Sequence, residues 1–179
     1  MEPSARPIDH FRHCPRCAAR LPPRAHPAAI ECAACSFLLF FNPASAVGAF
    51  LENAAGEVLF LKRARQPGLG RLGLPGGFID AGETAEAALR RELREEIGLE
   101  TLTARFLCSQ PNDYEYRGVQ YAVLDLFFVV HSPDPAAAID PEEVSELVWR
   151  RPAGVLAEEI AFASVRAALA VYRADRAVP

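Results

Sequence analysis

The most constraining feature of this sequence is the spacing of glycines and charged residues between Gly77 and Leu99. Within it, Glu92, Glu95 and Glu96 lie in a segment rich in good helix formers. Residues at i, i+3 and i+4 share one face of an α-helix, so three carboxylates there repel one another unless cations lie among them. Hard divalent cations prefer such oxygen ligands. The spacing therefore predicts a catalytic metal site on a helix.

The residues on either side predict how this helix is held. Thr84 is a suitable N-cap for a helix over residues 85–97, and Gly98 is a suitable stop. Gly76 and Gly77 allow the backbone to approach a ligand closely or to present a carbonyl to a metal. The opposite face of the helix is predicted to be buried, and its apolar residues are Ala87, Ala88, Leu89, Leu93 and Ile97.

The segment from Gly77 to Leu99 resembles the Nudix box, GX5EX7REUXEEXGU, in which U is an aliphatic residue, and it matches every specified position. The resemblance implies an α/β fold, an α/β/α sandwich with a mixed sheet. It also implies hydrolysis of a nucleoside diphosphate linked to another moiety X, giving a nucleoside monophosphate and phosphorylated X. A solvated acidic face on a surface helix would explain the charges, but not the glycines and Glu83 at their fixed offsets.

The resemblance assigns metal ligands to individual residues. Glu92 and Glu96 are the expected principal ligands of a catalytic Mg²⁺ or Mn²⁺. Glu95 is expected to be a further ligand or to contact water, and the carbonyl of Gly76 to complete the set. Such an ion neutralises the charge of the diphosphate, which otherwise opposes attack by water.

Two further residues of the box are expected to act on these glutamates. Arg91 and Glu83 are predicted to form an ion pair that orients the ligands. Together with Glu92 and Glu95 they make up the predicted catalytic set.

An additional acid is predicted in the acidic segment that precedes Trp149. Its position resembles the place where several Nudix enzymes contribute another metal ligand or a base, and Glu143 matches best by its offset from the tryptophan. The alternative is a solvated acidic loop. Trp149 itself is predicted to be a core residue.

The second strong signal is a pair of CxxC motifs separated by fourteen residues. This spacing fits a four-thiolate zinc site and resembles a zinc ribbon, with an iron site or a pair of disulfides as alternatives. The segment is too short and too rich in proline to build a core alone, so the metal is expected to stabilise it. The predicted domains are a zinc ribbon over residues 1–43 and a Nudix domain over residues 44–179. The predicted zinc ligands are Cys14, Cys17, Cys32 and Cys35.

The composition narrows the expected partners. The net charge is −4 and no apolar run reaches the length of a membrane span, which argues against nucleic acid and membrane partners. The polar start carries no apolar signal core, and reduced zinc-bound thiols suit the cytoplasm. Residues 1–43 carry five arginines against three acids, so a structural or dimer-supporting ribbon is favoured over one that binds nucleic acid. A homodimer is expected because many Nudix relatives are dimers.

The substrate is less well defined. A zinc ribbon followed by a Nudix domain resembles the NADH pyrophosphatases, whose signature after the box begins Ser-Gln-Pro-Trp. Here residues 109–111 agree and Asn112 replaces the tryptophan, so NADH or NAD and ADP-ribose-like substrates both stay open. Tyr114 and Tyr116 are candidates for stacking on a base, or alternatively cap a hairpin. A different class of function is a non-catalytic nucleotide-sensing or nucleic-acid-binding regulator.

The remaining secondary structure follows from apolar runs and turn signals. We expect strands over residues 37–42, 44–51, 57–63, 101–109, 119–131 and 146–150, and a last helix over residues 162–173.

Overall fold

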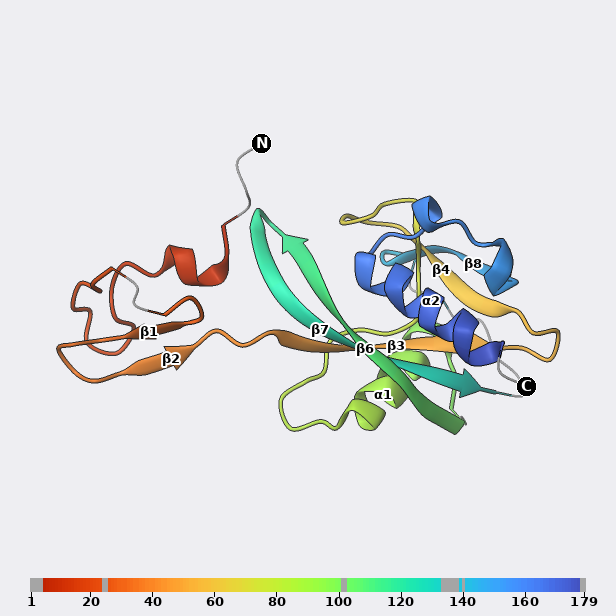
Figure 1. Ribbon diagram of the computed structural model, residues 1–179, viewed down its shortest axis with the longest axis horizontal. Coiled ribbons are helices and arrows are strands. Elements are labelled where there is room, and N and C mark those ends of the chain that lie inside the picture. Colours follow the sequence, from red (N-terminus) through yellow and green to blue (C-terminus); the bar gives the residue numbers. More distant parts are fainter. Residues whose placement is uncertain (1–4, 24–25, 101–102, 133–138, 140, 178–179) are drawn as a thin grey trace. The chain divides into compact units, whose positions relative to one another are not determined.

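The computed structural model describes residues 5–23, 26–100, 103–132, 139 and 141–177. By its internal contacts the chain divides into two compact units. The first comprises Met1–Ala44 and Asp113–Ala122, and the second comprises Ser45–Asn112 and Val123–Pro179. The first unit therefore includes a short segment from the middle of the chain, which the sequence did not predict. Figure 1 labels both α-helices and most of the strands.

The first unit holds little regular structure. A 3₁₀ helix, η1 (Pro7–His10), precedes an antiparallel pair of short strands, β1 (Ala29–Glu31) and β2 (Leu38–Phe40). In this pair Ile30 lies opposite Leu39. The backbone N–H of Gln120 donates to the carbonyl of Ala5 at 3.0 Å, which ties the segment 113–122 to the start of the described chain.

The second unit is built on a six-stranded sheet with the order β5-β4-β3-β7-β6, in which β8 also pairs with β4. The strands of this sheet are β3 (Ala44–Glu52), β4 (Val58–Arg63), β5 (Leu72–Gly73), β6 (Thr103–Tyr116), β7 (Val119–His131) and β8 (Val144–Arg150). Ala44 and the hairpin end of β6 and β7, residues 113–122, fall in the first unit. Its helices are α1 (Ala85–Ile97), α2 (Ala163–Arg176) and the 3₁₀ turns η2 (Pro152–Gly154) and η3 (Ala157–Glu159).

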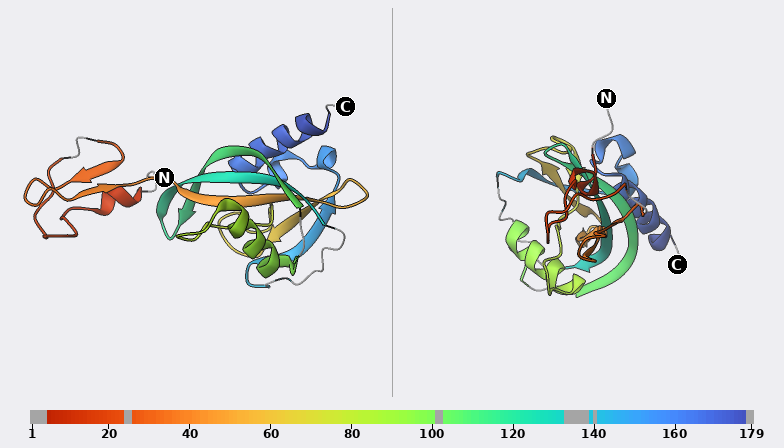
Figure 2. Two further views of the ribbon diagram at one scale, coloured as in Figure 1. Left: turned by 90° about the horizontal axis from the view of Figure 1, so that it is seen from below. Right: turned by 90° about the vertical axis from the view of Figure 1, so that its left-hand side faces the viewer.

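The two α-helices lie on opposite faces of the sheet (Figure 2). Each covers a separate apolar cluster, one that includes Leu93 of α1 with Val130 of β7, and one that includes Tyr172 of α2 with Phe50 of β3. The rings of Phe50 and Tyr172 stack with their centroids 4.6 Å apart. The predicted arrangement of a sheet between helices is therefore confirmed.

Helix α1 has the predicted bounds. The hydroxyl of Thr84 accepts a hydrogen bond from the N–H of Ala87 at 3.2 Å, and Gly98 ends the helix with a φ of 70°. Ala88, Leu89 and the other predicted apolar residues further along are buried, but Ala87 is exposed. The prediction for Ala87 was wrong because this residue lies in the capped first turn, away from the face that packs on the sheet.

The strands differ from prediction mainly in length. Strand β6 continues through Pro111 to Tyr116, since it is paired along the hairpin with the long strand β7. Proline is tolerated there because β6 is the outer strand of the sheet. Strand β5 was not predicted, and residues 101–102 of the predicted strand lie outside the described residues. None of the helices in the described ranges has the length and apolar character needed to cross a membrane.

Candidate metal and catalytic site

The segment before helix α1 is fixed against strand β3 by backbone hydrogen bonds. Val47 N–H donates to the carbonyl of Gly77 at 2.8 Å, and Ala49 N–H donates to that of Pro75 at 2.9 Å. Residues 75–77 therefore run alongside β3 and are hydrogen-bonded to its backbone. This pairing places the two predicted glycines, Gly76 and Gly77, beside Val47 of β3.

Both glycines are required by close approaches. Gly76 has a φ of 137°, and a Cβ atom there would lie 2.2 Å from the carbonyl oxygen of Val47. A Cβ atom on Gly77 would lie 2.5 Å from Oε1 of Glu92. A side chain at Gly76 would clash with the backbone of Val47, which cannot move without disturbing β3. A side chain at Gly77 would instead require the carboxylate of Glu92 to move from its present position.

The carboxyl of Glu96 is held by the same segment. The N–H of Gly76 donates to Oε2 of Glu96 at 2.7 Å. Burial nevertheless raises the pKa of Glu96 to about 8, with Glu92 and Glu143 adding negative charge nearby. Burial also raises the pKa of Glu92, against the opposing effect of Arg91. The site thus contains carboxylates whose charge the described protein groups leave incompletely compensated.

Arg91 is the central cation of the site. Its Nε and Nη2 donate to the two oxygens of Glu83, both at 2.9 Å, so the predicted ion pair is present. Its Nη1 donates to Glu92 at 2.7 Å and to Glu95 at 3.3 Å. The bond from Arg91, with that from the N–H of Asp80, lowers the pKa of Glu83 to about 2. Arg91 therefore links Glu83 to two of the three glutamates on α1.

Glu143 lies close to this group, just before strand β8. Its carbonyl accepts from the N–H of Ala64 at 2.9 Å, and its carboxylate pairs with Arg65 at 2.6 Å. Its charge contributes to the raised pKa values of Glu92 and Glu96. The structure thus brings the predicted fifth acid next to the glutamates of α1. Arg65 was not predicted, and the only signal for it in the sequence is a basic residue just beyond strand β4.

The donor set fits a hard divalent cation. It consists of three carboxylates on one helix, with Glu143 nearby. A bound cation would lower the raised pKa values of Glu92 and Glu96. The carboxylate oxygens do not converge: in the described part of the chain, only cysteines form a set of three or more potential ligands within 4.8 Å of one another. Arg91 and the N–H of Gly76 instead hold Glu92, Glu95 and Glu96. The part of the Gly76 carbonyl stays a prediction.

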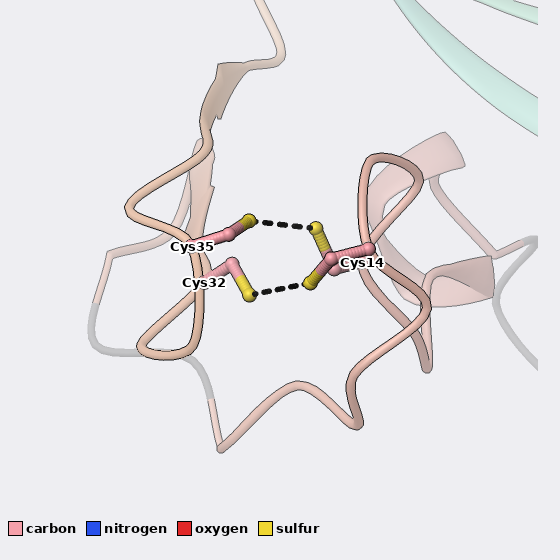
Figure 3. Close-up of side chains that lie close together, drawn as sticks. Cys14, Cys32 and Cys35 are labelled. Carbon is pink, nitrogen blue, oxygen red and sulfur yellow. Dashed lines mark hydrogen bonds between the residues drawn. The ribbon is translucent and has the colours of Figure 1, made fainter.

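The four predicted cysteines meet in the first unit, where Figure 3 shows the side chains of Cys14, Cys32 and Cys35 pointing toward one another. The Sγ atoms of Cys14 and Cys35 are 3.7 Å apart, and those of Cys17 and Cys32 are 3.6 Å apart. Tetrahedral zinc with Zn–S bonds of about 2.3 Å requires sulfurs roughly 3.8 Å apart. All four thiols are free. The geometry therefore fits the predicted zinc site and not the alternative of two disulfides.

The two CxxC turns repeat one backbone design. Ala18 N–H donates to the carbonyl of Cys14 at 2.9 Å, and Ser36 N–H donates to that of Cys32 at 2.8 Å. Ala18 and Ser36 both take a positive φ, 58° and 57°. This conformation is unfavourable for residues other than glycine. Because it follows both motifs, we infer that these turns orient the cysteine sulfurs toward one common point.

Tyr114 and Tyr116 belong to the first unit, whereas the glutamates belong to the second. Tyr116 is exposed, and the guanidinium of Arg117 lies 5.2 Å from the centre of its ring. Arg117 and Gly118 form the turn between β6 and β7. Both tyrosines therefore lie near a hairpin turn, and stacking on a base stays a prediction.

Asp125 of strand β7 is a buried acid to which no role was given from sequence. Its pKa is raised by burial, an effect that nearby Ser164 and Asn112 oppose. Trp149 of β8 is partly buried and packs against the cluster beneath α1, as expected of a core residue.

Comparisons with known proteins agree with this site. The model of the NUDIX domain family matches residues 42–169. The ADP-ribose pyrophosphatase of Methanocaldococcus jannaschii is 43% identical over 63 residues, which cover 35% of this chain and 37% of that protein. The NAD-capped RNA hydrolase ndx-9 of Caenorhabditis elegans is 29% identical over 142 residues, or 78% of this chain and 36% of that protein. The chain thus matches little more than a third of the length of these relatives.

Solved structures give the same result. The NUDIX domain of Shewanella oneidensis NrtR, solved with ADP ribose, superposes with a TM-score of 0.61 at 26% identity, covering 76% of this chain and 90% of that one. A NUDIX hydrolase from Nitrosomonas europaea shares the fold at 22% identity, with a TM-score of 0.60 over 94% of this chain and 95% of its own. The family model spans the strands β3 to β8, helix α1 with its glutamates and the first half of α2, and the chain therefore belongs to the Nudix family.

Proposed function

We propose that this chain is a metal-dependent Nudix pyrophosphatase, which hydrolyses a nucleoside diphosphate linked to another moiety X. The observation that carries the proposal is the group of three carboxylates that Arg91 and the N–H of Gly76 hold on α1. Burial raises the pKa of two of them, Glu92 and Glu96, and Glu143 adds negative charge nearby. Family membership alone would not establish activity, because a fold hosts many functions. A complete set of oxygen donors on a rigid helix supports catalysis more directly.

The metal would be held by carboxylates of three residues on α1, with Glu143 and the carbonyl of Gly76 as further donors. When bound, Mg²⁺ or Mn²⁺ supplies positive charge to the diphosphate and acidifies a water molecule for attack. Arg91 and the N–H of Gly76 hold these carboxylates on α1, and the oxygens would have to move closer together to share one ion. The ligands on α1 are Glu92, Glu95 and Glu96.

Three neighbours would keep these ligands in place. Arg91 holds Glu92 and Glu95 while it is itself clamped by both oxygens of Glu83. The N–H of Gly76 holds Glu96. Partners that orient ligands in this way commonly matter almost as much as the ligands themselves. Arg91 and Glu83 therefore act in the proposed reaction by positioning the glutamates.

The proposed substrate is an adenine-containing dinucleotide or nucleotide sugar, with ADP-ribose and NADH as the leading candidates. The names of the relatives support both, since they include an ADP-ribose pyrophosphatase and a NAD-capped RNA hydrolase. The Ser-Gln-Pro opening at residues 109–111 after a four-cysteine segment supports NADH, whereas Asn112 in place of tryptophan favours ADP-ribose. Tyr114 and Tyr116 are proposed to stack on the base.

The four-cysteine segment is proposed to hold one structural Zn²⁺. The spacing of the sulfurs supports zinc, and so does the small amount of regular structure in the first unit, which a metal would stabilise. A homodimer and a cytoplasmic location remain predictions.

The proposal is tested by incubating the purified protein with ADP-ribose, NADH and NAD-capped RNA, each with Mg²⁺ or Mn²⁺. We expect AMP and ribose 5-phosphate from ADP-ribose, and cleavage between the two phosphates of NADH. Glu96→Gln is the matched inactive control. Tight binding of ADP-ribose without hydrolysis under both metals would contradict the enzyme and support the nucleotide sensor instead. Hydrolysis restricted to nucleoside triphosphates would contradict the substrate and leave the reaction class intact.

A further inference from the structure

Arg65 forms an ion pair with Glu143 beside the predicted ligands, and the proposed reaction gives this pair no role. We propose that Arg65 holds Glu143 in the free enzyme and exchanges it for the diphosphate of the substrate, so that Glu143 becomes available to the metal when substrate binds. This inference rests on the proposed function. It assigns a diphosphate-binding role to a residue outside the Nudix box.

The pair is built so that it can separate without disturbing the sheet. Arg65 Nη2 lies 2.6 Å from Oε1 of Glu143, and the two side chains are 55% and 42% exposed. The backbone of Glu143 is held independently, because its carbonyl accepts from the N–H of Ala64 at 2.9 Å. Exposed ion pairs contribute little to stability. The guanidinium and the carboxylate can therefore change partners while β4 and β8 stay paired.

The pair also flanks the metal site. The charge of Glu143 contributes to the raised pKa values of Glu92 and Glu96, so its carboxylate lies near both. The next residue, Val144, is buried in the same apolar cluster as Leu93 of helix α1. Arg65 thus places its guanidinium at the margin of a strongly negative group, where an incoming diphosphate needs a cation.

Two neighbouring arginines are engaged elsewhere. Arg91 donates to Glu83, Glu92 and the carbonyl of Phe78. The guanidinium of Arg63 donates to the carbonyl of Pro67 at 2.6 Å and lies over the ring of Phe162. Arg65 is more exposed than Arg91, whose side chain is 21% exposed. Arg65 is therefore better placed than either of these two to meet a ligand arriving from solvent.

Exchange is favoured by the chemistry of both partners. A guanidinium binds phosphate oxygens through two parallel N–H donors, and a diphosphate carries more charge than one carboxylate. Glu143, once released, offers a hard oxygen ligand to Mg²⁺ or Mn²⁺. In the free enzyme, by contrast, the metal and Arg65 compete for the same carboxylate.

Two binding measurements test the exchange independently of turnover. The first is the Kd for Mn²⁺ without nucleotide, followed by electron paramagnetic resonance. The second is the Kd for α,β-methylene-ADP at saturating Mn²⁺, followed by calorimetry, since its carbon bridge resists hydrolysis. For Arg65→Ala we expect Mn²⁺ to bind about threefold more tightly and the diphosphate about tenfold more weakly, as lost charge-assisted hydrogen bonds predict. Arg65→Lys should recover part of the diphosphate affinity.

A matched control comes from the same two strands. Lys62 of β4 pairs with Glu146 of β8 at 3.3 Å, with 43% and 57% of the side chains exposed. Lys62→Ala removes a cross-strand ion pair of similar exposure and should leave both Kd values within about twofold of wild type, as exposed pairs generally do. In a Glu143→Gln background, Arg65→Ala should no longer tighten Mn²⁺ binding. Weaker Mn²⁺ binding in Arg65→Ala, or an unchanged diphosphate Kd, would overturn the proposal.

Binding and hydrolysis measured on the same protein distinguish a failure of this inference from a failure of the proposed function. If wild type binds α,β-methylene-ADP with the expected dependence on Arg65 but cleaves neither ADP-ribose nor NADH, the proposed substrate fails and the exchange stands. If wild type cleaves ADP-ribose and Arg65→Ala does so with unchanged KM, the exchange fails and the enzyme stands.

Discussion

Gly77 and Glu92 lie so close that a Cβ atom on the glycine would sit 2.5 Å from the carboxylate. The two residues are fifteen positions apart in the chain, and the present position of the carboxylate leaves no room for a side chain at residue 77. The backbone of Gly77 is fixed to β3 through Val47, and the carboxylate is fixed by Arg91. The first residue of the Nudix box is therefore a steric requirement of one of the predicted ligands.

Gly77→Ala should consequently abolish the proposed hydrolysis while the protein stays folded. The methyl group must displace the carboxylate of Glu92 or the backbone along β3, and we expect at least a hundredfold lower kcat/KM and a destabilisation of about 1–3 kcal/mol, as for other overpacked sites. Steady-state kinetics and urea denaturation measure the two effects. Gly154→Ala is the control for a lost glycine, because a Cβ there meets no atom within 4 Å and the backbone of Gly154 does not take a positive φ. Near-normal activity in Gly77→Ala would contradict the predicted placement of Glu92.

The raised pKa of Glu96 predicts a pH effect on stability in the absence of Mg²⁺ and Mn²⁺. Its carboxyl titrates at about 8 in the folded protein, mainly because of burial, and at about 4.3 when unfolded. A folded pKa above the unfolded value means that the contribution to stability is fully present below the unfolded pKa. It is lost as pH rises toward 8.

Glu96→Gln should therefore flatten this part of the stability profile and be more stable than wild type at pH 8 without Mg²⁺ or Mn²⁺. It should also lower turnover by about a hundredfold or more, because it removes a charged ligand. Thermal melting at pH 5 and pH 8 provides the comparison, with the exposed Glu86 as the control residue in Glu86→Gln. Equal melting temperatures of wild type and Glu96→Gln at pH 8 would show that the carboxylate carries no such penalty.

A second buried acid ties the last helix to the sheet. Glu52 of β3 accepts a hydrogen bond from the hydroxyl of Tyr172 on α2, and it also pairs with Arg176 at 3.1 Å. Tyr172→Phe keeps the ring stacked on Phe50 but leaves a buried carboxylate with one partner fewer. We expect a loss of about 1–3 kcal/mol in the free energy of unfolding. Urea denaturation measures it, and Val171→Ala on the exposed side of the same helix should change it far less.

Interactions between residues close in the sequence were predicted better than interactions between distant residues. Helix α1 has the predicted ends, because its cap at Thr84 and its stop at Gly98 depend on neighbours in the chain. The length of β6 was underestimated, because pairing with β7 carries it past residues that usually mark turns. The ion pair of Arg65 and Glu143 was not predicted, since it joins residues 78 positions apart. Such a contact can be predicted only once the pairing of β4 with β8 is known, because that pairing brings the two residues together.

The last prediction concerns the four-cysteine segment, where the sulfur spacing fits zinc. Purified protein should contain about one zinc per chain, and Cys32→Ser should lose it, because three thiolates bind the ion more weakly than four. Hydrogen exchange should then quicken in the described residues between 10 and 40, while the sheet and α1 of the second unit keep their protection through their own apolar clusters. Cys108→Ser is the matched control, because Cys108 lies on β6 outside the set of four and its replacement should leave the zinc content unchanged. Metal analysis that finds iron, or no metal, in wild-type protein would refute the zinc assignment and leave the Nudix site untouched.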